Sequence, residues 1–158
     1  MLNFLQRLCG VATFTRLFVD AIQGTGAAIY DTRKTTPGWR LLDKYAVSCG
    51  GGKNHRLGLF DAVLIKDNHL AGVQAERLAG VVFDMLNRVA STGKSAAFIE
   101  VEAANLAQMR ELCNVVGIDV ILLDNFSVPQ LAEAVQYRDS LGLRGKVELE
   151  ASGGVTLP

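Results

Sequence analysis

Short apolar runs recur along the chain, and most of them are joined by segments with helical spacing. The apolar runs cover residues 28–30, 62–65, 97–99, 120–123 and 147–149. The segments with helical spacing cover residues 73–89, 105–116 and 129–141. This alternation predicts an α/β fold with parallel strands, because two parallel strands need a crossover between them. Unbroken apolar runs are typical of strands that are buried on both faces.

A doubly wound sheet and a (β/α) barrel both fit this alternation. A full eight-stranded barrel takes about 250 residues, so a chain of 158 residues holds only part of one. Residues 2–20 are predicted to form a leading helix, since apolar side chains recur there on one helical face. Residues 36–60 are rich in glycine and are predicted to be mostly loop, with one helix around residues 39–45.

Composition limits the classes of partner. The chain is 49% hydrophobic and 20% charged, which excludes a disordered tail. Its 16 basic and 16 acidic residues balance, so we expect neither a nucleic acid nor a membrane as partner. Cys9, Cys49 and Cys113 are scattered and show no metal-ligand spacing, so we expect reduced thiols and a cytoplasmic location.

Each apolar run is followed by polar residues of functional type. These polar clusters cover residues 31–35, 66–69, 100–102, 124–125 and 150–154. All lie at the C-terminal ends of predicted strands, where parallel α/β proteins build their active sites. Strand ends are also polar simply because they reach solvent, but solvent exposure alone would not select both signs of charge so regularly. The pattern therefore predicts a functional site at this edge of the sheet.

Positive charge gathers in the first of these clusters. Residues 30–70 contain seven Lys and Arg against four acidic residues, a net +3, which leaves −3 for the rest of a neutral chain. Such a cluster suits an anionic ligand. We expect Arg33, Lys34 and Lys66 to contact it, because they follow predicted strands directly. Arg40 and Lys44 are expected to lie on a solvated face.

Two carboxylates end neighbouring predicted strands. Glu102 and Asp124 could hold Mg²⁺ or sugar hydroxyls, or stabilise developing positive charge. A structural ion pair with the basic residues is the other interpretation. The segment Ser152-Gly153-Gly154 offers backbone N–H groups to a phosphate, and it would serve equally well as a turn.

Taken together, these stretches resemble the quinolinate phosphoribosyltransferase family. The resemblance runs in order from about Leu2 to the last residue. It is carried by DTRKTTPG at 31–38, GGGKNHRLGL at 50–59, LIKDNH at 64–69, IEVE at 99–102, LLDNF at 122–126 and EASGGV at 150–155.

The resemblance implies a fold and a reaction. The fold is a partial (β/α) barrel over residues 27–158, with residues 1–26 as a leading helix and connection. An N-terminal α/β sandwich domain and the last barrel strands would lie outside this chain. The reaction is Mg²⁺-dependent transfer of phosphoribose from phosphoribosyl pyrophosphate to quinolinate, which gives nicotinate mononucleotide, pyrophosphate and CO₂ in NAD biosynthesis. A homodimer or larger assembly is also implied.

The resemblance also assigns roles to residues. Lys34, Lys66, Glu102 and Asp124 would be catalytic, with Glu102 and Asp124 serving the ribose, Mg²⁺ and the oxocarbenium-like transition state. Ser152, Gly153 and Gly154 would cradle the 5′-phosphate. The quinolinate pocket would be lined by Arg33, Lys34, Thr35, His55, Arg56 and Lys66.

Other functions remain open at this point. Lys66 at a strand end would suit a lyase that forms a Schiff base. A non-catalytic remnant would bind an anionic ligand without turnover. A relative that acts on nicotinate, or one associated with molybdate transport, would differ in substrate, because those ligands lack the second ring carboxylate of quinolinate.

Overall fold

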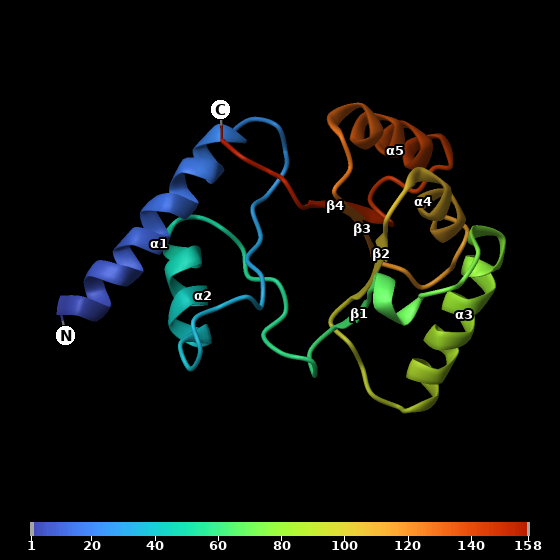
Figure 1. The fold of residues 1–158 in the computed structure, drawn as a ribbon, viewed down its shortest axis with the longest axis horizontal. Coiled ribbons are helices and arrows are strands. Elements are labelled where there is room, and N and C mark those ends of the chain that lie inside the picture. The colour runs from blue at the N-terminus through green and yellow to red at the C-terminus, as the bar shows by residue number, and fades with distance from the viewer. Residues whose placement is uncertain (1, 158) are drawn as a thin grey trace. The chain divides into compact units, whose positions relative to one another are not determined.

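The computed structural model describes residues 2–157 and divides into two compact units. One unit runs to Asp61 and includes the last residues from Thr156, and the other covers Ala62–Val155. The sequence had placed the division near residue 26. Figure 1 labels the helices and strands of both units.

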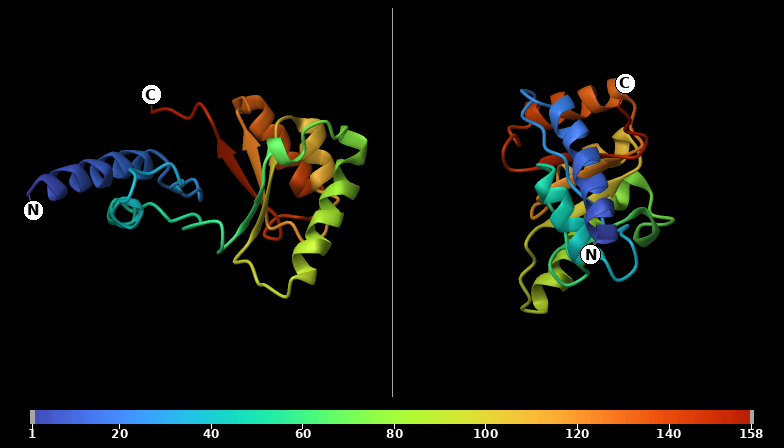
Figure 2. Two further views of the ribbon diagram at one scale, coloured as in Figure 1. Left: turned by 60° about the horizontal axis from the view of Figure 1, so that its bottom comes forward. Right: turned by 90° about the vertical axis from the view of Figure 1, so that its left-hand side faces the viewer.

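The second unit is built on a parallel sheet of four strands in the order β1-β2-β3-β4. Its strands are β1 (Val63–Ile65), β2 (Ile99–Ala103), β3 (Val120–Asp124) and β4 (Glu148–Ser152). Its helices are α3 (Ala75–Ser91), α4 (Leu106–Leu112) and α5 (Val128–Ser140), with a short 3₁₀ helix, η1 (Asp67–His69), after β1. The helices cover one face of the sheet (Figure 2). This open sheet confirms the predicted α/β fold with parallel strands, as part of a barrel.

Alternation along the strands supplies the core of this unit. Val101 pairs in register with Ile121, and Ala103 with Leu123, so these side chains share one face of the sheet. They are buried against helix residues such as Met109 of α4. Burial of this apolar surface is the main force that holds the helices onto the sheet.

The predicted strand at residues 97–99 is wrong in position, because β2 runs over Ile99–Ala103. Glu100 and Glu102 therefore lie inside the strand, not after it. The strand continues through them because Val101 and Ala103 reach the apolar core while the two glutamates point to the opposite face.

Local contacts fix the helices of this unit. The side chain of Asn105 accepts a hydrogen bond from the Gln108 N–H at 3.0 Å and so caps α4. Pro129 stands in the first turn of α5, where its missing N–H leaves no intrahelical hydrogen bond unmade. Near the other end of α5, Arg138 donates to the Val147 carbonyl at 3.1 Å and ties that helix to the segment before β4.

The first unit contains α1 (Leu2–Ala21) and α2 (Arg40–Cys49). Gly50 ends α2 against α1, where a Cβ would lie 2.7 Å from the Thr15 Cβ, so only glycine allows this approach. The predicted strand at residues 28–30 is wrong: only an isolated bridge joins Tyr30 to Lys53. Glycines flank both short partner segments, and glycine weakens a strand. Among the described residues, no helix is long and apolar enough to cross a membrane.

Candidate active site

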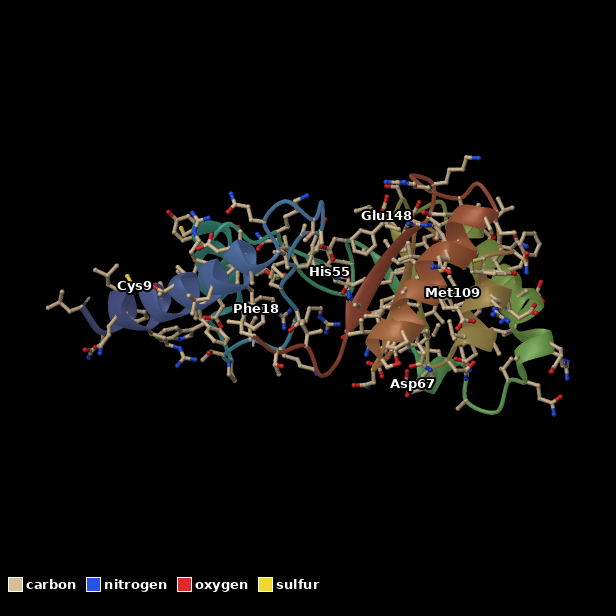
Figure 3. The ribbon with its side chains drawn as sticks, turned by 90° about the horizontal axis from the view of Figure 1, so that it is seen from above. Cys9, Phe18, His55, Asp67, Met109 and Glu148 are labelled. Atoms are coloured by element: carbon tan, nitrogen blue, oxygen red, sulfur yellow. The ribbon has the colours of Figure 1, made fainter. Side chains whose placement is uncertain are left out.

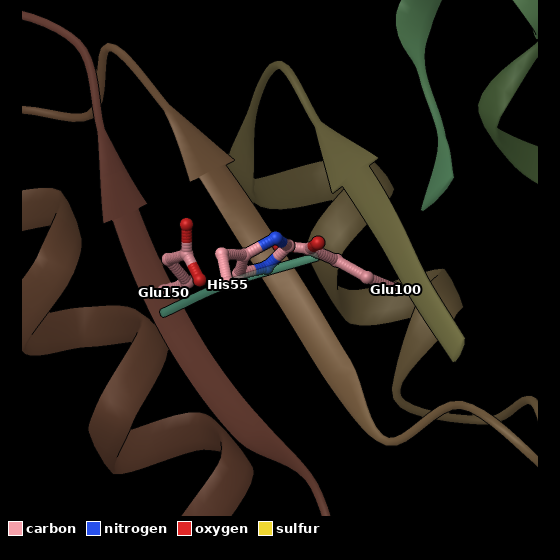
Figure 4. A group of neighbouring side chains, drawn as sticks. All are labelled: His55, Glu100 and Glu150. Atoms are coloured by element: carbon pink, nitrogen blue, oxygen red, sulfur yellow. The ribbon is translucent and has the colours of Figure 1, made fainter. Parts of the chain in front are cut away.

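The face of the sheet opposite the helices carries most of its charged side chains. Glu102 pairs in register with Leu122, which pairs with Glu150, and Asp124 pairs with Ser152. Partners in a parallel sheet point to the same side. Figure 4 shows Glu100 and Glu150 on this face, away from the helices. The set that shares this face, called here the polar face, consists of Glu100, Glu102, Asp124, Glu148, Glu150 and Ser152.

The predicted site residues lie at the carboxyl ends of the four parallel strands, which form one end of the polar face. Asp67, just after β1, and Glu148, the first residue of β4, lie at opposite ends of the sheet (Figure 3). Lys66, Glu102, Asp124 and Ser152 belong to the end marked by Asp67, because all four strands are parallel. The structure therefore gathers these four predicted residues at one edge.

An ion pair joins the first two strands at this edge. The Nζ atom of Lys66 lies 3.1 Å from Oε2 of Glu102. The Glu102 side chain is 6% exposed, whereas that of Lys66 is 47% exposed. A buried carboxylate needs a compensating partner, and Lys66 supplies it. The Lys66 backbone N–H donates to Nδ1 of His69 at 2.9 Å. This bond to a residue of η1 holds the backbone of Lys66 in place.

The ends of β3 and β4 are joined by Asn125. Its backbone N–H donates to the Ser152 carbonyl at 2.7 Å, which continues the ladder beyond Asp124. Its side-chain amide donates to Oδ2 of Asp124 at 2.9 Å. Gly153 and Gly154 follow with φ angles of 85° and 66°, which side chains rarely tolerate. The exposed turn at Gly153-Gly154 therefore starts directly beside the Asp124 carboxylate.

The remaining predicted site residues lie in the first unit. The Asp31 N–H donates to the Lys53 carbonyl at 3.0 Å, and the Lys53 N–H donates to the Ile29 carbonyl at 2.7 Å. These bonds hold the loop 31–35 beside the loop 53–56. Arg33 and Thr35 are half-buried, Lys34 is exposed and Arg56 is buried. The structure thus brings Arg33, Lys34, Thr35, His55 and Arg56 together on two adjacent loops.

The expectation that Lys44 is solvated is wrong. Lys44 is 2% exposed, and its Nζ lies 2.5 Å from Oδ1 of Asp31. The same carboxylate oxygen accepts the His55 N–H at 2.8 Å. Lys44 is buried because α2 directs it toward the two basic loops, where the Asp31 carboxylate compensates its charge.

Arg40 is half-buried and forms hydrogen bonds to two neighbouring segments. Its guanidinium donates to the Leu57 carbonyl at 3.1 Å and lies 3.4 Å from Oγ1 of Thr35. Asp43, one turn further along α2, accepts the Thr36 N–H at 3.0 Å. Side chains of α2 therefore hold the loop 31–36 in place through hydrogen bonds.

Asp61 closes the loop that follows Arg56. Partial burial raises the pKa of Asp61, but hydrogen bonds from the Leu57 and Gly58 N–H groups, with the positive charge of Lys44, outweigh burial and lower the pKa below its ordinary value. These two bonds measure 2.6 and 3.1 Å. The ionised carboxylate thus stabilises the turn at Leu57–Asp61.

Two carboxylates of the polar face, those of Glu102 and Asp124, have the donor chemistry of a Mg²⁺ site. Glu102 and Asp124 offer hard oxygen ligands from adjacent strands on one face of the sheet. Mg²⁺ is commonly held by one or two carboxylates together with substrate phosphates. The residues present therefore fit this ion.

The fold and the site define a class of protein: a partial parallel α/β barrel with acidic and basic side chains at the carboxyl ends of its strands. The chain belongs to the quinolinate phosphoribosyl transferase family, because residues 11–158 match the family's C-terminal domain.

Curated relatives and solved structures agree with this assignment. The nicotinate-nucleotide pyrophosphorylase [carboxylating] of Mycobacterium leprae is 48% identical over 99% of this chain and 52% of its own length. The probable enzyme of that name from Bacillus subtilis is 40% identical over 99% of this chain and 50% of its own length. The crystal structure of NadC from Streptococcus pyogenes is similar with a TM-score of 0.81 and 38% identity, over 98% of this chain and 50% of that one. The chain thus spans about half the length of the curated relatives it matches.

Sequence reasoning missed two parts of this site. It gave no role to Asn125, although asparagine directly after a strand is among the residues that tolerate a positive φ. It also missed the buried pair of Lys44 and Asp31, for which the only signal was a lysine within the helix predicted around residues 39–45.

Proposed function

We propose that the complete protein transfers phosphoribose from phosphoribosyl pyrophosphate to quinolinate, with loss of CO₂, to form nicotinate mononucleotide and pyrophosphate in NAD biosynthesis. One observation carries this proposal. In a member of the quinolinate phosphoribosyl transferase family, Lys66, Glu102, Asp124 and Ser152 gather at one edge of the polar face.

The basic loops supply the charge that a dicarboxylate needs. Arg33, Lys34 and Arg56 lie on loops joined through the Asp31 carboxylate and backbone bonds. Guanidinium groups bind carboxylates through two parallel hydrogen bonds. In the proposed enzyme these cations bind the two carboxylates of quinolinate together with Thr35, His55 and Lys66. Lys34 and Lys66 are also proposed to serve the pyrophosphate.

The polar face supplies the opposite charge. Phosphoribosyl transfer builds positive charge on the ribose as pyrophosphate leaves, and a fixed carboxylate stabilises that charge. Glu102 and Asp124 take this role and bind the ribose hydroxyls, and they would hold Mg²⁺, which would supply positive charge to the pyrophosphate. The backbone of Ser152, Gly153 and Gly154 binds the 5′-phosphate.

The proposal extends to assembly and location. The complete enzyme is proposed to be a homodimer or larger, with quinolinate and phosphoribosyl pyrophosphate as its small-molecule partners. A cytoplasmic location is proposed, and the free thiols of Cys9, Cys49 and Cys113 support a reducing compartment. Some plant relatives are named as chloroplastic or mitochondrial, so location varies among relatives.

A substrate comparison tests the proposed reaction. The complete protein is incubated with phosphoribosyl pyrophosphate, Mg²⁺ and either quinolinate or nicotinate, and nicotinate mononucleotide is measured by mass spectrometry. We expect product from quinolinate in large excess over product from nicotinate. Equal product from both, or none from quinolinate, would contradict the proposal. A separate sample with an aldehyde or ketone substrate and borohydride tests the lyase alternative, which requires a covalent adduct on Lys66.

A further inference from the structure

Asn125 has an unusual backbone conformation for its residue type. Among residues 2–157 it is the one non-glycine residue with a positive φ, at 56°. Asparagine tolerates this region better than most residues, but the conformation persists only where surrounding contacts hold it. Asn125 follows the last residue of β3 directly, at the edge that carries the proposed site.

Three contacts hold Asn125 in place. Its backbone N–H donates to the Ser152 carbonyl at 2.7 Å. Its side-chain Nδ2 donates to Oδ2 of Asp124 at 2.9 Å. Its side chain also fills the space beside Gly153, where an added Cβ would lie 2.6 Å from the Asn125 Cγ. One amide side chain therefore touches both the carboxylate of Asp124 and the start of the glycine turn.

We propose that Asn125 is a positioning residue that fixes the Asp124 carboxylate and the Gly153 turn relative to one another. This inference rests on the proposed function, in which Asp124 serves the ribose and the turn binds the 5′-phosphate. A hydrogen bond to one carboxylate oxygen limits rotation of the group and presents the other oxygen in a fixed direction. Such preorganisation lowers the transition-state free energy, because no reorientation is needed during the reaction.

Two variants of the complete enzyme separate the side chain from the backbone. Asn125→Gly keeps a residue that adopts a positive φ freely but removes the amide. Asn125→Asp keeps the shape and also tolerates this conformation, but a carboxylate cannot donate to Asp124. The matched control is Asn114→Gly, because Asn114 is an exposed residue after α4 whose side chain bonds only locally, to the Arg110 carbonyl.

We expect both Asn125 variants to lower kcat by about 10- to 100-fold, the scale seen when the supporting partner of a ligating group is lost. The KM for quinolinate should change less than twofold, since the basic loops bind that substrate. Asn114→Gly should keep kcat within twofold. A purely structural role would instead leave Asn125→Asp with wild-type kcat.

A double-mutant cycle gives a second measurement. Gly153→Ala places a methyl group against the Asn125 side chain, so we expect kcat to fall. In the Asn125→Gly background that methyl group has room, so the same change should cost at least threefold less. Equal costs in both backgrounds would show that the two residues act independently.

The outcomes distinguish this inference from the proposed function. A complete wild-type enzyme without activity on quinolinate would refute the proposed function, and this inference with it. An active enzyme whose Asn125→Gly and Asn125→Asp variants keep kcat within twofold would refute the positioning role alone. Should Asn125→Gly fail to fold, the kcat and the KM for quinolinate of the Asn125→Asp variant still decide the question.

Discussion

Lys66 and Glu102 join two neighbouring strands at the edge of the sheet, with Nζ 3.1 Å from Oε2. The carboxylate is buried and the ammonium is half exposed. A charge that would be costly to bury alone is thereby compensated, and the cation is held where it can also meet an anionic substrate. The role proposed for Lys66, contact with the anionic substrates, depends on this pair.

Removal of the Lys66 ammonium should therefore impair catalysis. We expect Lys66→Ala in the complete enzyme to lower kcat/KM by about 10²- to 10³-fold, the scale measured for loss of one preorganised electrostatic donor. Steady-state kinetics with quinolinate gives the comparison. Lys94→Ala is the control, because Lys94 is exposed in the turn after α3. Similar rates for the two variants would contradict the role of Lys66.

Lys44 should matter for stability. Its side chain is 2% exposed and paired with Asp31. Lys44→Met leaves the Asp31 carboxylate buried without its cation, which costs about 3–5 kcal/mol. Urea denaturation should show this loss, with Lys94→Met within about 0.5 kcal/mol of the wild type. A Lys44→Met protein as stable as the wild type would show that the pair is dispensable.

Asp61 should make stability depend on pH. Its pKa is lower in the folded protein than in the unfolded chain. The carboxylate therefore stabilises the fold fully above its unfolded pKa, about 3.9, and loses that contribution as the pH falls through the lower folded value. We expect Asp61→Asn to lower the urea midpoint at pH 7, and to lower it less at pH 3, which is below the unfolded pKa. A difference that is the same at both pH values would contradict this linkage, and Asp84→Asn, on the exposed face of α3, is the control.

The three thiols should differ in reactivity. Burial raises the pKa of the Cys113 thiol, although Arg138 opposes the shift. Cys9 and Cys49 are exposed. Iodoacetamide at pH 8 should therefore modify Cys9 and Cys49 much faster than Cys113, as peptide mass spectrometry would show. Cys113 should react at a similar rate only after urea unfolding. Rapid modification of Cys113 in the folded protein would contradict its burial.

The sequence predicted the order of strands and helices in the second unit, because apolar runs and helical spacing alternate there. It located β1, β3, β4 and the helices α3, α4 and α5 to within a few residues. It misplaced β2. Glu100 and Glu102 were predicted as polar residues after the strand, but they lie within it, on the face opposite its apolar side chains. It also predicted a strand at residues 28–30, where the structure has only an isolated bridge between Tyr30 and Lys53. This run is short and lies beside glycines, so it forms too few hydrogen bonds with a neighbouring segment to make a strand.

The candidate site was predicted in part. The polar clusters include Lys66, Glu102 and Asp124, and the structure places these three residues at one edge of the sheet. The roles given to these residues stay predictions. The contacts that hold the site in place could not be predicted from the sequence. The burial of Lys44 beside Asp31 and the packing of Asn125 against Gly153 depend on residues distant in the chain.

The most direct test measures CO₂ release by the complete enzyme. Quinolinate labelled with ¹⁴C in the carboxyl group that is lost is mixed with phosphoribosyl pyrophosphate and Mg²⁺. Wild type, Glu102→Gln and Glu148→Gln are compared, since Glu148 shares the polar face but lies at the opposite end of β4 with a 70% exposed side chain. We expect wild type and Glu148→Gln to release ¹⁴CO₂ at rates within twofold, and Glu102→Gln to fall by about 100-fold or more. No release by the wild type, or equal release by all three, would contradict the account.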